Sequence, residues 1–319
     1  MSDLPLTPPG AVPHRGVTES HAGVPKSRRV KRLTGGDRVA VILMVAIPAV
    51  LVIALVWLPA IASVVLSFTN WNGIGGLGRS NFIGGENYVN VFTNYPPFWP
   101  AMRHNALWLV VLFLVATPVG MLFAVLIDKD LRGSRFYQTA LYLPVVLSLA
   151  LIGFIWQLIY SSNQGLLNAV FGTHVDWYGN PSVNIWAALV ATAWRHIGYI
   201  MLLYLAGLKG VDMALREAAQ VDGANQVQTF FRIIFPVMRP INIIVLVVTV
   251  IESLRAFDLV WVINQGRNGL ELISALVVQN IAGEASRIGF GSALATIMLV
   301  ISLVFIAIYL ATVMKEDER

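Results

Sequence analysis

The sequence predicts an all-α, polytopic membrane protein with six transmembrane helices. Of its 319 residues, 57% are hydrophobic and only 12% are charged, whereas a soluble domain carries about 25% charged residues. Apolar stretches of about 20 residues, the length that crosses a bilayer as a helix, recur along the chain. This composition argues against a cytosolic globular enzyme, because so apolar a chain requires an apolar solvent around it.

Six apolar segments are the predicted spans. The first, 39–68, contains Pro48 and Pro59 as candidate kinks, which neighbouring helices can accommodate. A seventh apolar segment, 270–282, is too short to cross and is expected to lie at the membrane surface or to dip into it. The other five predicted spans are 106–127, 140–160, 185–208, a segment that begins near Ile241, and 290–314.

The distribution of basic residues predicts the orientation. With six spans both termini share one side, and that side carries sixteen of the 22 Lys and Arg residues, against four on the opposite side. Because cytoplasmic loops are rich in Lys and Arg, both termini are predicted to be cytoplasmic. The predicted organisation is a disordered basic tail (1–38), a six-helix transmembrane domain (39–314) and a short cytoplasmic C-terminus (315–319).

Two further observations limit the function classes. The basic cluster at 26–38 precedes the first span, so we interpret it as a topology determinant that can touch lipid headgroups rather than as a nucleic-acid site. The chain contains no cysteine and only five scattered histidines. We therefore predict no disulfide, no metal site, no cysteine nucleophile and no catalytic residue.

The loop 209–240 is strongly patterned. Segment 213–221 favours a helix, with Asp212 as its N-cap, and Asp222-Gly223 is a turn signal. A second helix is predicted over 225–235, with Asn225 and Gln228 at capping-box spacing and Pro236 at its end. We call these two helices and their turn the elbow.

The second helix of the elbow carries an apolar stripe at helical spacing, formed by Val227, Phe230, Phe231 and Ile234. An exposed ridge of this kind is unfavourable in water unless it docks onto something. A partner protein, the chain's own spans and the membrane surface are all possible docking surfaces.

The elbow resembles the EAA loop of ABC-importer permeases, which has a Glu-Ala-Ala triplet, a Gly six residues after the Glu and a Pro nineteen after it. Gly223 and Pro236 fall at these offsets from Glu217. The resemblance implies that this loop is the coupling helix seated in a cytoplasmic ATPase. Glu217 is expected to reach a cation or backbone N–H groups and to brace the turn. The matching positions are Glu217, Ala218, Ala219, Asp222, Gly223, Ala224, Phe230 and Pro236.

Other segments are similar to carbohydrate permeases of the maltose type: 67–71 with 82–88, 254–260, and 289–294. At 264–269 the chain reads Asn-Gln-Gly-Arg-Asn-Gly, where the family often has Thr-x-Gly-Gly-Pro. The likeness runs from about residue 39 to 314 and implies the MetI-like fold of type I ABC importer permeases. It further implies a second, different permease, a cytoplasmic ATPase dimer, an extracytoplasmic solute-binding protein and a bacterial or archaeal cytoplasmic membrane.

Two ionisable residues are predicted near the membrane midplane. Arg195 lies ten residues into the fourth span and Glu252 eleven into the fifth, which places each about 15 Å deep in a core of about 30 Å. Arg255 and Asp258 are expected to continue one side of the fifth span. Together with the nearby Trp194, Tyr199 and Phe257, these residues offer the charged and aromatic groups that suit a sugar. A structural ion pair, or charges facing the partner permease, is the alternative interpretation.

The function predicted from these features is the permease subunit of an ATP-driven, binding-protein-dependent sugar importer. The chain has no Walker A pattern, so ATP is expected to be used by the partner ATPase, and no cofactor is expected on this chain. A self-sufficient secondary transporter or channel is the alternative, although no inverted pair of broken helices is evident. An intramembrane enzyme would need a convergent nucleophile and base, and no such spacing occurs.

Overall fold

The computed structural model describes residues 34–78, 81–129, 132–283 and 286–317. Within these ranges all regular elements are helical, and the only strand-like pairing is an isolated bridge between Thr69 and Phe82. The all-α prediction is confirmed. The chain divides into two compact units, Met1–Leu55 and Val56–Arg319. Most of the predicted tail, up to residue 33, lies outside the described residues.

The first predicted span is helical and begins four residues earlier than expected. Thr34 caps α1 (Gly35–Val52): its hydroxyl accepts a hydrogen bond from the Asp37 N–H (3.3 Å), and the Asp37 carboxylate accepts one from the Thr34 N–H (2.9 Å). This capping box satisfies two backbone donors of the first turn. The helix continues through η1 (Ile53–Trp57) and α2 (Leu58–Leu66), a run of 32 residues.

Four helices of the described chain are long and apolar enough to cross a membrane. Besides 35–66 they are Phe98–Asp128, α9 (Asn184–Lys209) and α16 (Ile288–Asp317), the last of which qualifies over Ile288–Ala307. Phe98–Asp128 consists of α4 (Phe98–Val111), η3 (Leu112–Ala116) and α5 (Thr117–Asp128). The second, fourth and sixth predicted spans therefore correspond to single helical runs.

The third predicted span is a bent pair of helices, and the fifth is the second member of another bent pair whose first member is the second helix of the elbow. The prediction of one helix over 140–160 is wrong: α6 (Ser134–Val146) and α7 (Leu149–Ile159) meet at 104°. Leu147 is extended at this break, and the Ser148 side chain caps α7 by accepting from the Leu151 N–H (3.2 Å). The second pair, Gln226–Val237 and Arg239–Asn264, is bent by 77°. Counting each bent pair as one span gives six.

Each described π-helical turn is followed two residues later by a proline. η1 precedes Pro59, η3 precedes Pro118, and η4 (Phe230–Ile234) precedes Pro236. A proline ring clashes with the carbonyl four residues before it and supplies no N–H. The wider π-turn, bonded from residue i to i+5, relieves this clash while the helix continues. At Pro59, Pro118 and Pro236 a widened turn therefore accompanies the proline, whereas Pro48 and Pro144 lie inside helices without one.

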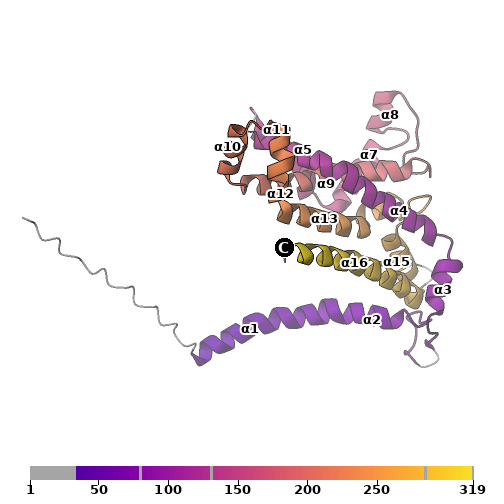
Figure 1. The fold of residues 1–319 in the computed structure, drawn as a ribbon. Coiled ribbons are helices and arrows are strands. Elements are labelled where there is room, and N and C mark those ends of the chain that lie inside the picture. The colour runs from indigo at the N-terminus through magenta and orange to yellow at the C-terminus, as the bar shows by residue number, and fades with distance from the viewer. Residues whose placement is uncertain (1–33, 79–80, 130–131, 284–285, 318–319) are drawn as a thin grey trace, which may run out of the picture. The chain divides into compact units, whose positions relative to one another are not determined.

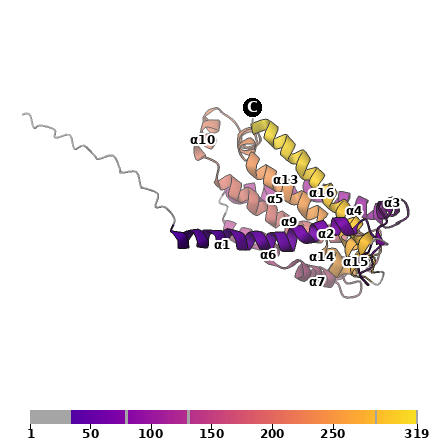
Figure 2. The same ribbon diagram turned by 90° about the horizontal axis from the view of Figure 1, so that it is seen from below.

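Within the second unit, α5 lies against α9, and α15 (Ile273–Ile281) lies against α16 and α4 (Figures 1 and 2). The segment expected at the surface, 270–282, thus forms a short helix that is largely buried among spans. The helix α7 packs on α14, and both α2 and α3 pack on α16. The remaining elements are α3 (Glu86–Thr93), α8 (Leu166–Phe171), α10 (Met213–Val221), α11 (Gln226–Thr229), α12 (Phe235–Val237), α13 (Arg239–Leu254) and α14 (Asp258–Asn264).

Candidate functional site

The backbone of the elbow is fixed by hydrogen bonds between near neighbours in sequence. The Asp212 carboxylate caps α10 by accepting from a backbone N–H of its first turn (2.9 Å). The helix ends in a Schellman motif, in which the N–H groups of Gly223 and Ala224 each donate to a carbonyl of the last turn (3.0 Å). Asn225 and Gln228 then form the expected capping box. The predicted helix–turn–helix is therefore present, and Gly223 supplies the left-handed residue at its turn (φ +78°).

The predicted apolar ridge is exposed at only part of its length. Val227 and Phe231 are 65% and 57% exposed, whereas Phe230 is half-buried and Ile234 is buried. Ile234 belongs to a core cluster shared by α5, α9 and α13. The π-turn η4 explains the difference, because its extra residue shifts the side-chain phase that the α-helical spacing predicts.

Two other expectations for the elbow are corrected. Pro236 does not end the second helix, which runs to Val237 before the chain bends at Met238. Glu217 does not brace the turn: like Ala218 it is exposed, and its carboxylate makes no hydrogen bond or ion pair with the described residues. Ala219, by contrast, is buried.

The brace is made by Asp128, at the end of α5. Its carboxylate accepts from the Arg216 guanidinium (2.8 Å) and lies 3.1 Å from the Lys209 ammonium. The Asp128 side chain is only 8% exposed, and a buried carboxylate is stable in its charged form when cations pair with it. Arg216 also donates to the Leu208 carbonyl (3.1 Å). These contacts fasten the first helix of the elbow to two spans, and sequence reasoning missed them because the partners lie 88 positions apart.

A cleft of about 210 Å³ lies between the elbow and the end of α5. Asp128 and Arg216 line one part of it, and Phe230 and Ile234 line another. Lys129, next to Asp128, reaches across to the Gln226 side chain (2.8 Å). The elbow is thus held at both of its helices, and its exposed tip carries Val227 and Phe231.

Arg195 and Glu252 are brought together. An Arg195 guanidinium nitrogen on α9 lies 3.4 Å from a Glu252 carboxylate oxygen on α13. The two side chains are 23% and 39% exposed in this single chain. Each therefore has a partner within the chain and also a face that is open to further contacts.

The other predicted path residues are more dispersed. The fifth span is not continuous past Leu254: Arg255 ends α13 and Asp258 begins α14, so these two do not extend the same helical face. Phe257 stacks on Trp261 with ring centroids 5.2 Å apart. Trp194 is partly exposed and meets Trp156 edge to face, and Tyr199 packs at the core cluster beside α5.

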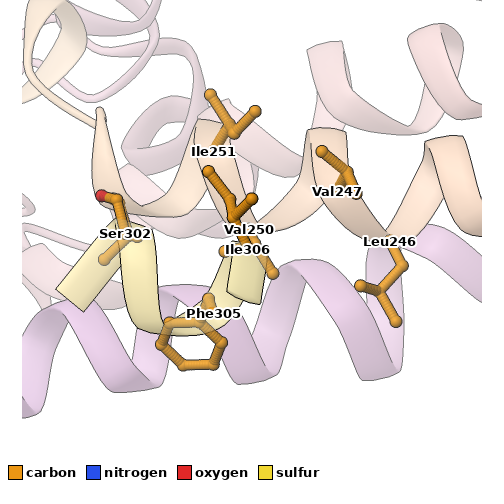
Figure 3. Close-up of a pocket in the computed structure, with 8 residues that line it drawn as sticks. Leu246, Val247, Val250, Ile251, Ser302, Phe305 and Ile306 are labelled. Atoms are coloured by element: carbon orange, nitrogen blue, oxygen red, sulfur yellow. The ribbon is translucent and has the colours of Figure 1, made fainter. Parts of the chain in front are cut away.

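A different face of α13 forms an apolar crevice with α16 (Figure 3). Its volume is about 40 Å³. It is lined by Leu246, Val247, Val250, Ile251, Leu254, Ser302, Phe305 and Ile306.

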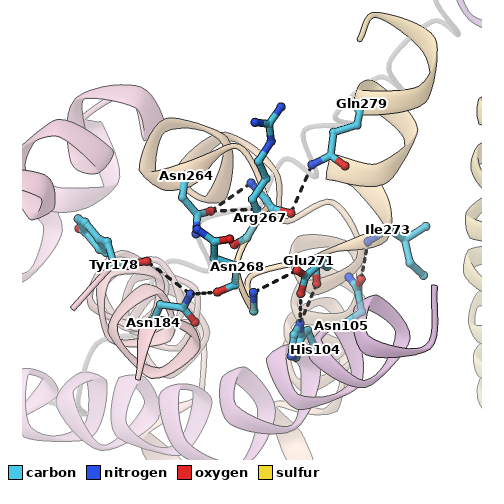
Figure 4. A network of polar contacts seen from close by, with 12 residues as sticks. His104, Asn105, Tyr178, Asn184, Asn264, Arg267, Asn268, Glu271, Ile273 and Gln279 are labelled. Carbon is cyan, nitrogen blue, oxygen red and sulfur yellow. Dashed lines mark hydrogen bonds and ion pairs between the residues drawn. The ribbon is translucent and has the colours of Figure 1, made fainter. Parts of the chain in front are cut away.

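A polar network fixes the connection between α14 and α15, residues 265–272 (Figure 4). The Asn105 amide donates to the Ser253 carbonyl (3.1 Å) and accepts from the Ile273 N–H (3.0 Å). The His104 Nδ1–H donates to the Glu271 carbonyl (2.9 Å). The Asn184 side chain donates to the backbone carbonyl of residue 268. This network joins three spans, and no local sequence signal predicts it.

Comparisons with known proteins agree with this geometry. The family described as binding-protein-dependent transport system inner membrane component matches residues 26–315. The osmoprotective compounds uptake permease protein GgtC of Synechocystis is 34% identical over 270 residues, covering 81% of this chain and 93% of GgtC. The xylose/arabinose import permease protein XacH of Haloferax volcanii is 32% identical over 253 residues, covering 77% and 78%.

A solved structure shows the same fold. It is that of a bacterial alginate ABC transporter in complex with an alginate pentasaccharide-bound periplasmic protein. One of its chains aligns with a TM-score of 0.73 at 20% identity, covering 85% of this chain and 93% of that one. The chain therefore has a fold that is found in a bacterial ABC transporter.

Fold and elbow together define a transport component that is embedded in a membrane. The chain belongs to the family of binding-protein-dependent transport system inner membrane components. The resemblance to ABC importer permeases is thereby confirmed. The family description states that transport depends on a binding protein. This favours the importer interpretation over the two alternatives, a self-sufficient transporter and an intramembrane enzyme.

Proposed function

We propose that this chain is one of two different permeases in an ATP-driven sugar importer, and that its elbow docks on a cytoplasmic ATPase dimer. It performs no covalent chemistry and carries no ATPase site of its own. The observation that supports this most is an elbow braced by Asp128 that presents Val227 and Phe231 to solvent. Burying an exposed Phe side chain contributes about 1.5–3 kcal/mol, so docking stabilises a tip that is unfavourable in water.

A sugar or polyol is the proposed substrate class. Relatives named for pentoses and for osmoprotective compounds, and a structural neighbour that imports alginate, support it. The partly exposed Arg195–Glu252 pair is suited to hydroxyl groups, which accept from the guanidinium and donate to the carboxylate. The translocation path is proposed to lie between this chain and the second permease, with a solute-binding protein delivering the sugar from outside.

The orientation follows the basic residues, with both termini in the cytoplasm. Because the chain has no cysteine, a single introduced cysteine reports its side of the membrane. In intact cells Ser182→Cys should react with an impermeant thiol reagent, and Gln226→Cys should react only after the membrane is opened. The reverse pattern would contradict the proposed orientation.

Attachment of the ATPase tests the role of the elbow. Val227→Ala and Phe231→Ala should reduce ATPase copurification and hydrolysis stimulated by the solute-binding protein, while the chain remains inserted. Phe171→Ala, which removes a Phe that is 68% exposed from α8, is the control and should change neither. Normal ATPase attachment and turnover in both elbow variants would show that this surface is not the coupling contact.

A further inference from the structure

A second polar cleft lies away from both the elbow and the Arg195–Glu252 pair. It is formed by the segment after α2, by α3 and by the start of α16, and its volume is about 350 Å³. This is within the range of small-molecule sites, about 300–1,000 Å³. We call it the amide cleft, because asparagine side chains predominate among the residues that line it: Asn70, Asn72, Asn87, Asn90 and Asn94.

The floor of the amide cleft is preformed. The buried Asn87 amide donates to the carbonyls of Ser67 and Thr69, both at 2.8 Å. The Gly289 N–H donates to the Trp71 carbonyl (3.0 Å). A Cβ on Gly289 would lie 1.9 Å from the Thr69 carbonyl oxygen, so only glycine permits this approach. Buried backbone contacts therefore hold α16 against the segment that carries the cleft.

Two opposite charges line this cleft without pairing. Glu86 and Arg287 both border it, yet in the described chain neither forms an ion pair within 4.0 Å. The Arg287 guanidinium instead lies over the Phe290 ring, 5.3 Å from its centroid. Both charged groups are exposed and free to contact a ligand.

The amides add unused hydrogen-bonding groups of both kinds. The Asn90 oxygen accepts from the Asn94 side chain (3.0 Å), which leaves the Asn90 NH₂ and the Asn94 oxygen without a partner in the described chain. Trp71 and Tyr95 place aromatic rings in the same lining. Donors, acceptors and ring faces thus occur within a single cleft.

A ligand without net charge fits this combination best. An anion would be opposed by Glu86 and a cation by Arg287, and a purely apolar ligand would leave the amides and both charges unsatisfied. A neutral polyhydroxylated molecule donates to the carboxylate, accepts from the guanidinium and amides, and lays its C–H face on an aromatic ring. We propose that the amide cleft binds a neutral sugar or polyol, at a site that shares no residue with the Arg195–Glu252 pair.

The test measures sugar binding without ATP and without transport. The full-length chain, purified with its partner subunits in nanodiscs, is titrated with maltose, trehalose, xylose and glycerol by saturation-transfer-difference NMR. Glu86→Ala and Arg287→Ala should each weaken saturable binding about tenfold or more, as expected on losing a hydrogen bond to a charged group. Arg103→Ala removes an exposed arginine outside the cleft and should bind as the parent does.

Glu252→Gln distinguishes sugar binding in the amide cleft from binding at the proposed path. Saturable sugar binding that depends on Glu86 and Arg287 should persist in that variant. The proposal is overturned if no probe binds saturably to the parent, or if binding is lost only in Glu252→Gln. It is also overturned if the cleft variants weaken association of the solute-binding protein while sugar binding is unchanged or absent, since the cleft would then be a protein-docking surface. None of these outcomes depends on ATPase attachment, so failure here leaves the proposed role of the elbow intact.

Discussion

The turn and caps of the elbow and the α14–α15 connection differ in how far away in sequence their hydrogen-bond partners lie. The turn and caps of the elbow use partners at most five positions apart, such as Ala224 N–H to Ala219 carbonyl. The α14–α15 connection has local bonds too, such as those of Asn264, but adds partners that are 84, 167 and 168 positions away. The turn and caps of the elbow therefore need no distant partner, whereas the connection is completed by bonds to α4 and α9.

In the elbow, the bonds that shape the backbone are different from the contacts that set its position on the spans. The elbow acquires its shape locally, and its position is set by few long-range contacts, chiefly that of Arg216 with Asp128. In the connection, the bonds of Asn264 act within one turn, and the bonds from α4 and α9 hold its backbone in position. Substitutions that affect the two regions should thus have different consequences. Three predictions test this and a fourth concerns the Arg195–Glu252 pair, which belongs to neither region; they run from the largest to the smallest expected effect.

Asp128→Asn should have the largest effect. It removes the carboxylate that pairs with Arg216 and Lys209, and breaking a largely buried pair costs about 3 kcal/mol. We expect the elbow to keep its helices but to lose its fixed position, so amide hydrogen exchange should rise in α10 and ATPase stimulation should fall. Asp128→Glu keeps the negative charge beside both cations and should retain more of the protection and of the stimulation. Unchanged protection of α10 in Asp128→Asn would contradict the brace.

Asn105→Ala should destabilise the second unit by about 2 kcal/mol, because it leaves the Ser253 carbonyl and the Ile273 N–H buried and unpaired. Asn264→Ala is the matched control, since Asn264 bonds only within its own turn, to Gly266 and Arg267. Thermal unfolding in detergent compares the two variants. Equal losses would remove the distinction between long-range and local stabilisation.

Gly223→Val should reduce the stability of the elbow turn by about 1–2 kcal/mol, because a residue with a side chain is strained at φ +78°. No neighbouring atom lies within 4 Å of a Cβ there, so the strain comes from the backbone alone. Asn tolerates this conformation better than Val does, and Gly223→Asn should retain more of the coupled ATP hydrolysis. Insertion of the spans should be normal in both. If Val and Asn behave alike, the left-handed turn is not what the elbow requires.

The Arg195–Glu252 pair should show the smallest effect on stability. At 3.4 Å and with both side chains partly exposed, its coupling energy in a double-mutant cycle should be about 1 kcal/mol or less. Glu252→Ala should impair sugar uptake more than assembly of the complex. Uptake at the parental rate, or loss of the assembled complex, would show that the pair has no role in the path.

The features predicted best from the sequence are helix limits and caps that are set by residues close together in the chain. The limits of α10 and the capping box at Asn225 follow from residues within one turn, and the apolar length of α9 determined its extent. The break between α6 and α7 was missed, although Pro144 and the cap at Ser148 mark it, because the apolar residues run through without a gap.

Prediction of the site was limited by partners distant in sequence. Arg195 and Glu252 were placed at similar depth, but only the packing of α9 on α13 shows that they pair. The role expected of Glu217 belongs to the adjacent Arg216, because its partner on α5 cannot be inferred from the loop. The predicted exposed ridge was correct for Val227 and Phe231 but not for Ile234. The prediction used the residue spacing of an α-helix, and η4 is a π-turn with a different spacing.

The π-turns before Pro59, Pro118 and Pro236 have a consequence for insertions and deletions. Each residue of an α-helix advances the side chains by about 100°, and a π-turn contains one residue more than the turn it replaces. Removing one residue from η3 would thus restore an α-turn and leave the facing of α4 relative to α5 almost unchanged, whereas the same deletion in the regular part of α4 would rotate the two helices by about a quarter of a turn. In a sequence alignment, a one-residue gap at a π-turn is therefore compatible with the same facing of both halves of a span.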